Sequence, residues 1–262
     1  MSDILEVTGR VALVTGAGQG VGKQVAEHLA AHGATVIVND YFLERAQAVA
    51  KDICDAGGKA HAVQADVTDY ANVKAMVAQV RDLAGPVDVL VNNAGNLGAN
   101  PSPDGRKPFW EVGPEVWRGA VDVNLYGVIN CTSAVIPDMI ERKSGRLITI
   151  ISDAGRVGQS DLEVYSAAKA GAAGLMRAVA RSMGRYQVTA NCVAIAATLT
   201  PPIEARLKDD PERLKKMMSH YVIRRPGRPT DVANMVLFLA SGASDWITGQ
   251  TYPVNGGFSF SM

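Results

Sequence analysis

The amino-acid sequence predicts an α/β fold with a doubly wound parallel sheet, on three observations. Short runs of β-branched and other apolar residues alternate along the chain with longer amphipathic stretches. The runs are apolar on both faces, as in parallel strands that are covered by helices on either side of the sheet. Glycine or polar turns bound the runs, and the alternation keeps a spacing typical of strand–helix–strand units.

The individual elements follow from these patterns in chain order. The apolar runs predict strands at residues 11–15, 35–38, 87–91, 146–151 and 188–195. The amphipathic stretches predict helices at residues 21–31, 43–55, 70–83 and 165–184. No internal repeat, low-complexity segment or Pro/Ser-rich linker divides the chain, so residues 1–262 are expected to form one domain.

Two segments interrupt the alternation. Residues 96–110 are rich in Gly, Pro and Asn, and they follow a predicted strand at the end where open α/β sheets bind ligands. Residues 198–228 include a Pro-Pro pair near their start and a predicted helix. Long excursions from a compact domain are commonly lids or binding loops. Residues 198–228 are therefore predicted to form a substrate lid.

Composition bounds the function classes. The chain has 262 residues, enough to bury about 70–75% of its unfolded surface without a disulfide or metal. Its 26 basic and 26 acidic residues balance, so no nucleic-acid or membrane partner is expected. The chain has three cysteines without metal-ligand spacing, Cys54, Cys131 and Cys192, so no metal is expected. Because three scattered cysteines suit a reducing compartment, a cytoplasmic location is expected. The sequence shows no secretory signal and no apolar run long enough to span a bilayer.

The first chemical motif is a glycine-rich turn, TGAGQGVG, at residues 15–22. It lies between the first predicted strand and the first predicted helix, and this position makes the pattern specific. Without side chains, such a turn brings backbone N–H groups against a pyrophosphate at the positive end of a helix. The motif predicts a dinucleotide-binding loop, and a purely structural glycine turn is the alternative.

Asp40 follows the second predicted strand, roughly twenty residues beyond the glycine-rich turn. A carboxylate there accepts hydrogen bonds from the adenosine ribose and repels a 2′-phosphate, which predicts NAD rather than NADP. Tyr41 and Phe42 follow Asp40, and neither is a cation. Capping the helix predicted from residue 43 is a second role that is compatible with ribose binding.

The second constellation combines Tyr165 and Lys169 with Ser152 upstream. Residues four apart share a helix face, so the Lys169 ammonium can approach the Tyr165 phenol. A free phenol has a pKa of about 10, and a neighbouring cation favours the phenolate. Ser152 is expected at the end of its strand, beside the nucleotide crevice. The alternative is an exposed Tyr/Lys pair without chemistry.

Together, these motifs resemble those of the short-chain dehydrogenase/reductase family, over nearly the whole chain. The matching motifs are TGAGQGVG (residues 15–22), Asp66 in ADVTD, NNAG (92–95), Asn124 in VDVNLYG, Ser152 in ISDAG, YSAAK (165–169) and ITGQTYPVNGG (247–257). The resemblance implies a seven-stranded parallel Rossmann sheet with helices on both faces. It also implies a homotetramer or homodimer that acts on a small-molecule substrate.

The resemblance further implies the site residues. In the implied catalytic tetrad, Tyr165 is the general acid–base, and Lys169 lowers its pKa and holds the nicotinamide ribose. Ser152 would hydrogen-bond the substrate oxygen, and Asn124 would hold a proton-relaying water. The implied cofactor contacts are Gly16, Gln19, Gly20, Val21, Gly22, Asp40, Asp66, Val67, Asn92, Asn93, Ala94, Gly95, Tyr165, Lys169 and Thr200.

One departure from the family pattern lies after the last predicted strand. Ile195-Ala196 stands where the family usually has Pro-Gly. Losing that turn is expected to alter the path of the loop beside the nicotinamide. Thr200 still matches the threonine that the family places at the nicotinamide carboxamide.

The predicted function is NAD-dependent interconversion of a secondary alcohol and a ketone. A non-catalytic nucleotide sensor of the same fold would not need four filled tetrad positions. Halohydrin dehalogenases, which are non-redox relatives, lose the glycine-rich loop and carry arginine at the lysine position. This chain has neither change.

The substrate expectation comes from residues 198–228, where cations exceed anions. The cations are Arg206, Lys208, Arg213, Lys215, Lys216, Arg224, Arg225 and Arg228, and the anions weighed against them are Glu204, Asp209, Asp210 and Glu212. A basic rim suits a phosphate-bearing coenzyme A thioester. The stretch SDAGRVGQSDLEVY also resembles dehydrogenases of cyclic or branched hydroxyacyl-CoA esters, with Arg156 as a further cation. A solvated lid helix and a free or steroid-like alcohol substrate are the alternatives.

Overall fold

The computed structural model of the chain describes residues 3–96, 102–200, 204 and 210–260. In this part of the chain, seven parallel strands form one sheet in the order β3-β2-β1-β4-β5-β6-β7. The strands are β1 (Val11–Val14), β2 (Thr35–Asp40), β3 (Lys59–Gln64), β4 (Val89–Asn92), β5 (Gly145–Ser152), β6 (Val188–Ile195) and β7 (Thr251–Val254). The strand order reverses between β1 and β4, which confirms the predicted doubly wound Rossmann sheet.

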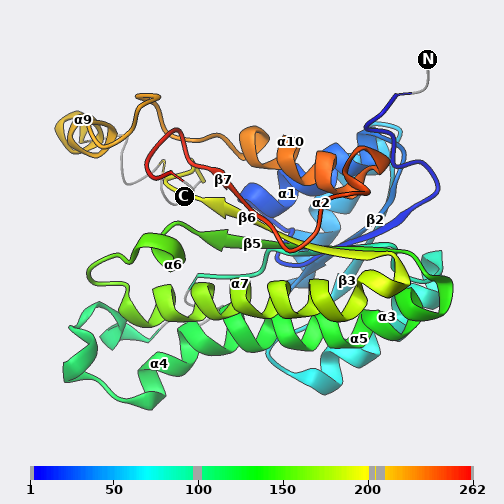
Figure 1. Cartoon of the computed structure of the whole chain (residues 1–262), viewed down its shortest axis with the longest axis horizontal. Helices are drawn as coiled ribbons and strands as arrows, with labels where there is room; N and C mark the ends of the chain where they lie inside the picture. The colour runs from blue at the N-terminus through cyan, green and yellow to red at the C-terminus, as the bar shows by residue number, and fades with distance from the viewer. Residues whose placement is uncertain (1–2, 97–101, 201–203, 205–209, 261–262) are drawn as a thin grey trace.

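Helices cover both faces of the sheet (Figure 1). One layer holds α1 (Gly20–Ala31), α2 (Leu43–Asp55) and α10 (Pro229–Ala240), and the other holds α3 (Tyr70–Ala84), α4 (Pro114–Val121), α5 (Gly127–Arg142) and α7 (Glu163–Met183). Alternate residues of a strand face the two layers, so Val36 packs in one core and Ile37 in the other. Both side chains are fully buried, as expected for a parallel sheet with two covered faces.

The predicted strands and helices all form, with ends that differ by at most two residues. Two strands, β3 and β7, were not predicted from apolar runs. Both lie at the edges of the sheet and are less buried than the central strands. In β3, Lys59, His61 and Gln64 break the apolar run, and β7 contains Pro253, which edge strands tolerate.

A long helix runs from Pro114 to Arg142 through α4, a π-helical segment at Asp122–Tyr126 (η3) and α5. Among the described residues it is long and apolar enough to cross a bilayer, although 39% of its apolar window is buried within the fold. No uninterrupted apolar run in the sequence indicates such a helix. Because α5 packs against α3 and the sheet and α4 packs against α7, its apolar composition fits a helix that covers a core.

The two irregular segments leave the sheet at its carboxyl edge. The described part of the first contains two 3₁₀ turns, Pro103–Arg106 and Phe109–Glu111. The second leaves and returns at one place, because Thr198 pairs with Gly227 in a parallel bridge. It contains α9 (Pro211–Met218). Arg206, Lys208 and Asp209, which entered the predicted charge excess, lie outside the described residues.

Candidate active site

The predicted site residues gather at the carboxyl edge of the sheet, around the point where strand order reverses. Asp40 ends β2, Asn92 ends β4 and Ser152 ends β5. The glycine-rich turn follows β1, which lies between β2 and β4. In open α/β sheets this switch point opens the crevice in which ligands bind.

The glycine-rich turn is shaped by close contact with the segment after β4. Gly16 has a φ of +60°, and a Cβ there would lie 2.8 Å from the Ala94 Cα. A Cβ at Gly22 would lie 2.4 Å from the Asn93 Nδ2. That Nδ2 donates hydrogen bonds to the carbonyls of Thr15 (2.9 Å) and Gly16 (3.0 Å). Both glycines therefore have a structural role as well as the predicted cofactor role.

The start of α1 is open to an anion. Gln19 precedes the helix in an extended conformation without a side-chain cap, and the first turn carries no acidic residue. Its first N–H groups and the helix dipole favour a negative charge there. Gly20 has a φ of +58° and faces Thr200, whose Cγ2 would lie 3.3 Å from a Cβ at that glycine. Val21 and Gly22 are buried behind the turn.

Asp40 lies against the glycine-rich turn, as an adenosine-ribose ligand requires. Its Oδ2 accepts a hydrogen bond from the Gly18 N–H at 3.0 Å, and its Oδ1 accepts one from the Phe42 N–H. Arg45 also approaches this turn, which the residues next to Asp40 in the sequence do not indicate. A Cβ at Gly18 would lie 2.6 Å from the Arg45 Cβ and 2.7 Å from the Asp40 Oδ2. The Arg45 guanidinium itself lies over the Phe42 ring, 4.3 Å from its centroid.

The segment after β3 forms the next wall. Asp66 is half-buried, and its Oδ1 accepts hydrogen bonds from the Thr68 N–H (2.9 Å) and hydroxyl (2.7 Å). Val67 is buried, and its Cγ2 would lie 2.8 Å from a Cβ at Gly127. These contacts fix the residues that the family resemblance assigns to the adenine.

Ser152 and Tyr165 meet at the end of β5. Both are half-buried, and a hydrogen bond joins their side chains. Burial raises the pKa of Tyr165, and the hydrogen bond from Ser152 only partly opposes it. The direction is opposite to the lowered pKa that the resemblance implied. In the chain alone the Tyr165 phenol is therefore neutral, and it can donate a proton.

Lys169 is buried one helical turn beyond Tyr165. Its Nζ donates a hydrogen bond to the Ile150 carbonyl at 2.9 Å and lies 5.8 Å from the Tyr165 ring centroid. Burial lowers the pKa of Lys169 to about 8. An ammonium has three donors, so Nζ can bind further acceptors in the crevice.

Asn124 lies in the π-helical segment η3, which rotates it relative to a regular helix. Its Nδ2 donates to the carbonyls of Asn96 (2.6 Å) and Ala120 (2.8 Å). Its buried Oδ1 has no hydrogen-bond partner among the described residues. A Cβ at Gly95 would lie 3.0 Å from that Oδ1 and 3.3 Å from the Lys169 Nζ. π-Helical turns are frequent at functional sites, and this one brings Asn124 and Lys169 together.

These features fit a nicotinamide dinucleotide. The glycine-rich turn and the uncapped start of α1 suit the pyrophosphate, and the Asp40 carboxylate suits a ribose. The unpartnered Asn124 Oδ1 and the remaining donors of Lys169 mark polar groups that await a ligand or water. The structure thus brings these predicted residues to the carboxyl edge of the sheet, and their roles stay predictions.

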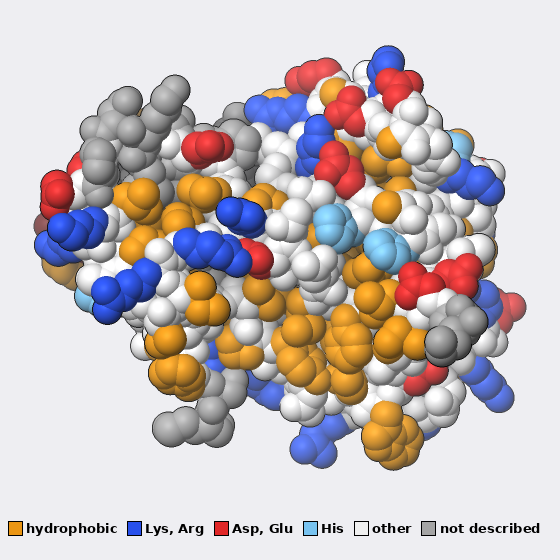
Figure 2. Space-filling view, turned by 90° about the horizontal axis from the view of Figure 1, so that it is seen from above, with side chains coloured by type: hydrophobic (Ala, Val, Ile, Leu, Met, Phe, Trp, Pro, Cys, Tyr) orange, Lys and Arg blue, Asp and Glu red, His pale blue; other side chains and the backbone are white. Residues whose placement is uncertain are grey.

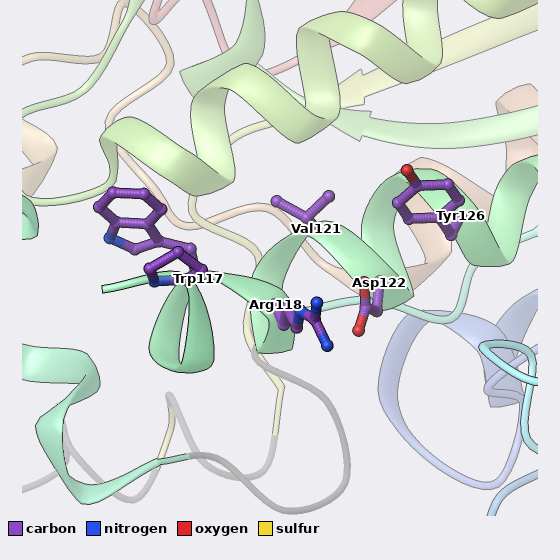
Figure 3. A pocket seen from close by; sticks show the side chains of 6 residues that line it. Trp117, Arg118, Val121, Asp122 and Tyr126 are labelled. Carbon is purple, nitrogen blue, oxygen red and sulfur yellow. The ribbon is translucent and has the colours of Figure 1, made fainter. Parts of the chain in front are cut away.

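A separate hollow of about 340 Å³ is lined by residues of α4 and η3 (Figure 3). Its lining includes Trp117, Arg118 and Tyr126, none of which was predicted as a site residue. The Trp117 indole N–H donates to the Phe109 carbonyl at 3.2 Å. This hollow is distinct from the crevice that holds Tyr165 and Lys169.

Two further residues that organise the crevice were not predicted. The Thr15 hydroxyl accepts hydrogen bonds from the N–H groups of Asn93 (3.0 Å) and Ala94 (3.1 Å). The Tyr221 hydroxyl accepts one from the Ala197 N–H at 3.0 Å. Thr15 stands inside the recognised motif, whereas nothing in the sequence relates Tyr221 to Ala197, because 24 positions separate them.

Comparisons with known proteins agree with this arrangement. A family model described as enoyl-(acyl carrier protein) reductase matches residues 16–259. The 3-oxoacyl-[acyl-carrier-protein] reductase of Staphylococcus aureus (strain N315) is 38% identical over 250 residues, which cover 94% of this chain and 96% of that protein.

Two solved structures share the fold over almost the whole chain. A 7α-hydroxysteroid dehydrogenase complexed with NADH and 7-oxo glycochenodeoxycholic acid has a TM-score of 0.90 at 34% identity, covering 98% of both chains. A gluconate 5-dehydrogenase from Burkholderia cenocepacia J2315, in complex with NADP and tartrate, has a TM-score of 0.90 at 32% identity, covering 99% of both chains. On the fold, the motifs and these relatives, the chain belongs to the short-chain dehydrogenase/reductase family of nicotinamide-dependent oxidoreductases.

Proposed function

We propose that the protein is an NAD-dependent oxidoreductase that interconverts a secondary alcohol and a ketone. The observation that carries the proposal is the convergence of Ser152, Tyr165 and Lys169 at the end of β5, with Asn124 facing Lys169. A sensor that only binds nucleotide has no use for a buried lysine beside a phenol and a serine, because burying that cation costs stability.

The proposed chemistry is a proton transfer coupled to a hydride transfer. The cofactor supplies the hydride when a ketone is reduced and accepts it when an alcohol is oxidised. In reduction, the neutral Tyr165 phenol gives its proton to the substrate oxygen, while the Ser152 hydroxyl donates a hydrogen bond to that oxygen. Oxidation requires the Tyr165 phenolate, which burial disfavours in the chain alone, and this phenolate takes the alcohol proton. Lys169 and Asn124 would hold the ribose and a water that replaces the proton.

The preference for NAD over NADP rests on Asp40. Its carboxylate lies at the turn where the adenosine ribose would bind, so a 2′-phosphate would meet a negative charge. Arg45 acts against this preference for NAD, because an arginine at this place can bind the 2′-phosphate of NADP. Its guanidinium lies over Phe42, and Asp40 is the nearer charge to Gly18. We therefore propose NAD, with Arg45 as the residue that limits the preference.

For the substrate, we propose a hydroxyacyl-CoA or ketoacyl-CoA ester. Lys and Arg side chains gather over the end of the molecule that carries α9 (Figure 2). Lys215, Lys216 and Arg224 are exposed there, whereas Arg225 is paired with Asp231 at 2.7 Å. Arg156 is also used internally, since it pairs with Asp153. Ion pairs within the protein thus lower the number of cations that the basic rim can offer, but Lys215, Lys216 and Arg224 are exposed and can bind a phosphate-bearing substrate.

A second substrate class, a free secondary alcohol with an apolar or steroid-like body, is favoured by a different observation. Val157, Val222 and Phe260 are each more than half exposed, and Arg156 joins α6 (Ala154–Val157) to the Phe260 carbonyl. Exposed apolar side chains beside a reaction site suit an apolar ligand. The experiment below separates the two classes.

We also propose a homotetrameric, cytoplasmic enzyme. The long helix Pro114–Arg142 covers the core with part of its surface, but only 39% of its apolar window is buried, which leaves apolar surface for a subunit interface. Cys54 is an exposed free thiol, as suits a reducing compartment. Light scattering after size-exclusion chromatography measures the assembly, and a monomer at micromolar concentration would contradict this part of the proposal.

The test of the proposed function is steady-state kinetics followed by nicotinamide absorbance. One hydroxy acid is offered as its CoA ester and as its N-acetylcysteamine ester, beside a steroid alcohol, each with NAD and NADP. We expect turnover with NAD, and a preference for the CoA ester that fades at high salt because screening weakens the basic rim. Equal turnover of the two esters at both salt concentrations would replace the CoA proposal by the apolar alcohol. No turnover of any alcohol or ketone would remove the function.

A further inference from the structure

A polar cluster directly after Ser152 ties the C-terminal segment to the end of β5. The Asp153 side chain is 2% exposed, and its Oδ1 pairs with the Arg156 Nη1 at 2.6 Å. Its Oδ2 accepts a hydrogen bond from the Asn255 Nδ2 at 2.6 Å. Arg156 Nη1 also donates to the Ser259 hydroxyl at 2.8 Å. These four residues, Asp153, Arg156, Asn255 and Ser259, are named the tail clasp here.

The tail clasp contains a buried carboxylate, Asp153, at a position where a neutral side chain would cost less desolvation free energy. A carboxylate removed from water is expensive unless a partner cation and hydrogen-bond donors compensate it. Asp153 receives that compensation from Arg156 and Asn255, which come from different parts of the chain. The Arg156 Nη2 adds a hydrogen bond to the Phe260 carbonyl at 3.2 Å. The tail, residues 255–260, is therefore held specifically at the position next to Ser152.

The tail in turn packs against the return of the predicted lid. The Gly256 carbonyl accepts a hydrogen bond from the Ile223 N–H at 2.8 Å. A Cβ at Gly257 would lie 2.7 Å from the Val222 Cβ, so the two backbones approach closely. The rings of Phe258 and Tyr221 are in contact, with centroids 5.1 Å apart.

Tyr221 carries this contact on to the loop after β6. It is 7% exposed, and its hydroxyl accepts a hydrogen bond from the Ala197 N–H at 3.0 Å. Burial, together with the nearby Asp153 carboxylate, raises the pKa of Tyr221, so its hydroxyl stays neutral. Ala197 directly follows Ile195-Ala196, the pair that replaces the expected Pro-Gly. The Asp153 N–H closes the circuit with a hydrogen bond to the Ile195 carbonyl at 2.9 Å.

We propose that Asp153 and Arg156 are positioning residues for substrate binding. The tail clasp holds the tail, the tail holds Tyr221, and Tyr221 holds the loop at residues 195–200 in the place that a local Pro-Gly turn would otherwise determine. This inference rests on the proposed function, because it assigns residues 195–200 and 219–228 to the substrate side of that site. The tail clasp acts on substrate affinity and leaves the hydride and proton transfers to the tetrad.

The test uses Arg156→Gln in the full-length protein, with Arg156→Lys as the conservative variant. We expect Arg156→Gln to raise KM for the preferred substrate about tenfold, with kcat within about threefold of wild type and the Kd for NAD unchanged. Arg156→Lys keeps the positive charge, so its KM should be close to that of wild type. Hydrogen exchange by mass spectrometry should show faster exchange at residues 195–200 and 219–225 in Arg156→Gln.

Arg142→Gln is the matched control, because Arg142 also pairs with an aspartate, Asp88, and binds a carbonyl, Val87, but at the opposite edge of the sheet. If Arg156→Gln fails to fold, Asn255→Ala tests the same clasp from the tail. The inference would be overturned if Arg156→Gln had the wild-type KM, or if Arg142→Gln changed KM and hydrogen exchange equally. Faster exchange in Arg156→Gln that is confined to residues 255–260 would also overturn it. Because exchange needs no substrate, it decides the coupling even if the wild-type protein oxidises no alcohol, the outcome that would remove the proposed function.

Discussion

At the amino edge of the sheet, both side-chain oxygens of Asp88 have hydrogen-bond partners, whereas at the carboxyl edge the side-chain oxygen of Asn124 has none among the described residues. Asp88 accepts hydrogen bonds from Arg142 and from the Val11 N–H, so it joins α5 to β1. The buried Asn124 Oδ1 has no partner among the described residues. Arg146 has an unpartnered Nε at the amino edge, but its Nη atoms bind Gly145 and Asp245.

The difference teaches how the fold separates stability from function. An unsatisfied buried polar group costs roughly 1–3 kcal/mol, so the unpartnered Asn124 Oδ1 fits the proposed role of holding a water. Lys169 follows the same logic, because burial lowers its pKa and so disfavours the charged form that the proposed role requires. At the amino edge, hydrogen bonds of Asp88 join elements of the fold. At the carboxyl edge, Asn124 and Lys169 have polar atoms that can still bind a ligand or water.

The largest expected effect is at the carboxyl edge. Tyr165→Phe removes the proposed proton-transfer hydroxyl, so kcat should fall about a thousandfold, in the range that general acid–base catalysis supplies. The free energy of unfolding and the Kd for NAD should change little, because the ring keeps its packing. Stopped-flow or steady-state nicotinamide absorbance measures the rate. A variant that keeps more than about a tenth of the rate would show that another group transfers the proton.

The next effect is on stability and depends on pH. The pKa of Lys169 is about 8 in the folded protein against 10.5 as its ordinary value, so between these values the unfolded chain binds more protons and stability rises with pH. Below pH 8 the full penalty applies, about 3 kcal/mol. Lys169→Met removes the penalty, and also a hydrogen bond worth about 1 kcal/mol. The cofactor-free variant should therefore be more stable than wild type by about 2 kcal/mol at pH 7.

Urea unfolding of both proteins at pH 7 and pH 10 checks this prediction. The advantage of Lys169→Met should shrink as the pH rises between 8 and 10.5, because wild-type Lys169 is then neutral in the folded protein. A difference that is the same at both pH values would contradict a buried lysine with a lowered pKa.

At the amino edge the expected pattern is reversed. Asp88→Asn weakens the pairing with Arg142 but retains much of the shape, so it should cost about 2 kcal/mol of unfolding free energy. That corresponds to a Tm lower by roughly 5 °C for a chain of this size. Differential scanning calorimetry measures the loss. The kcat should stay within about twofold of wild type, and a large loss of rate would mean that the two edges are coupled.

The smallest expected effect concerns cofactor choice. Asp40→Ser removes the charge that opposes a 2′-phosphate and leaves Arg45 free to approach it, so the preference for NAD over NADP should narrow by about tenfold, or 1.4 kcal/mol. Fluorescence titration of both cofactors gives the two Kd values. In Asp40→Ser/Arg45→Ala the gain in NADP affinity should be smaller, because only the loss of the Asp40 repulsion remains. An unchanged ratio of Kd values in Asp40→Ser would exclude Asp40 as the discriminating group.

Much of the fold could be predicted because its central strands are apolar on both faces. Strand β6 was predicted with both ends correct, since its residues from Val188 to Ala194 are all buried. Strand β3 was missed because an edge strand is only partly buried and mixes Lys59 and Gln64 with its apolar residues. The local pattern of an edge strand contains too little burial to identify it.

The site was predictable where a motif keeps its residues close in sequence. Tyr165 and Lys169 share a helix face through their spacing alone, and their placement agrees with the prediction. Arg45 was missed because its approach to Gly18 depends on how α2 leaves β2. The rise in the pKa of Tyr165 was also missed, because it depends on how deeply the surrounding elements bury the phenol.

The sequence by itself determined the doubly wound sheet, the glycine-rich turn and the shared helix face of Tyr165 and Lys169, because each depends on periodicity or short spacing. Only the tertiary structure decided which charges remain available. It pairs Arg156 with Asp153 and Arg225 with Asp231, and leaves the Asn124 Oδ1 without a partner among the described residues. The physical reason is that burial and pairing are properties of groups that meet in space, and the contact of Arg156 with Ser259 joins residues 103 positions apart.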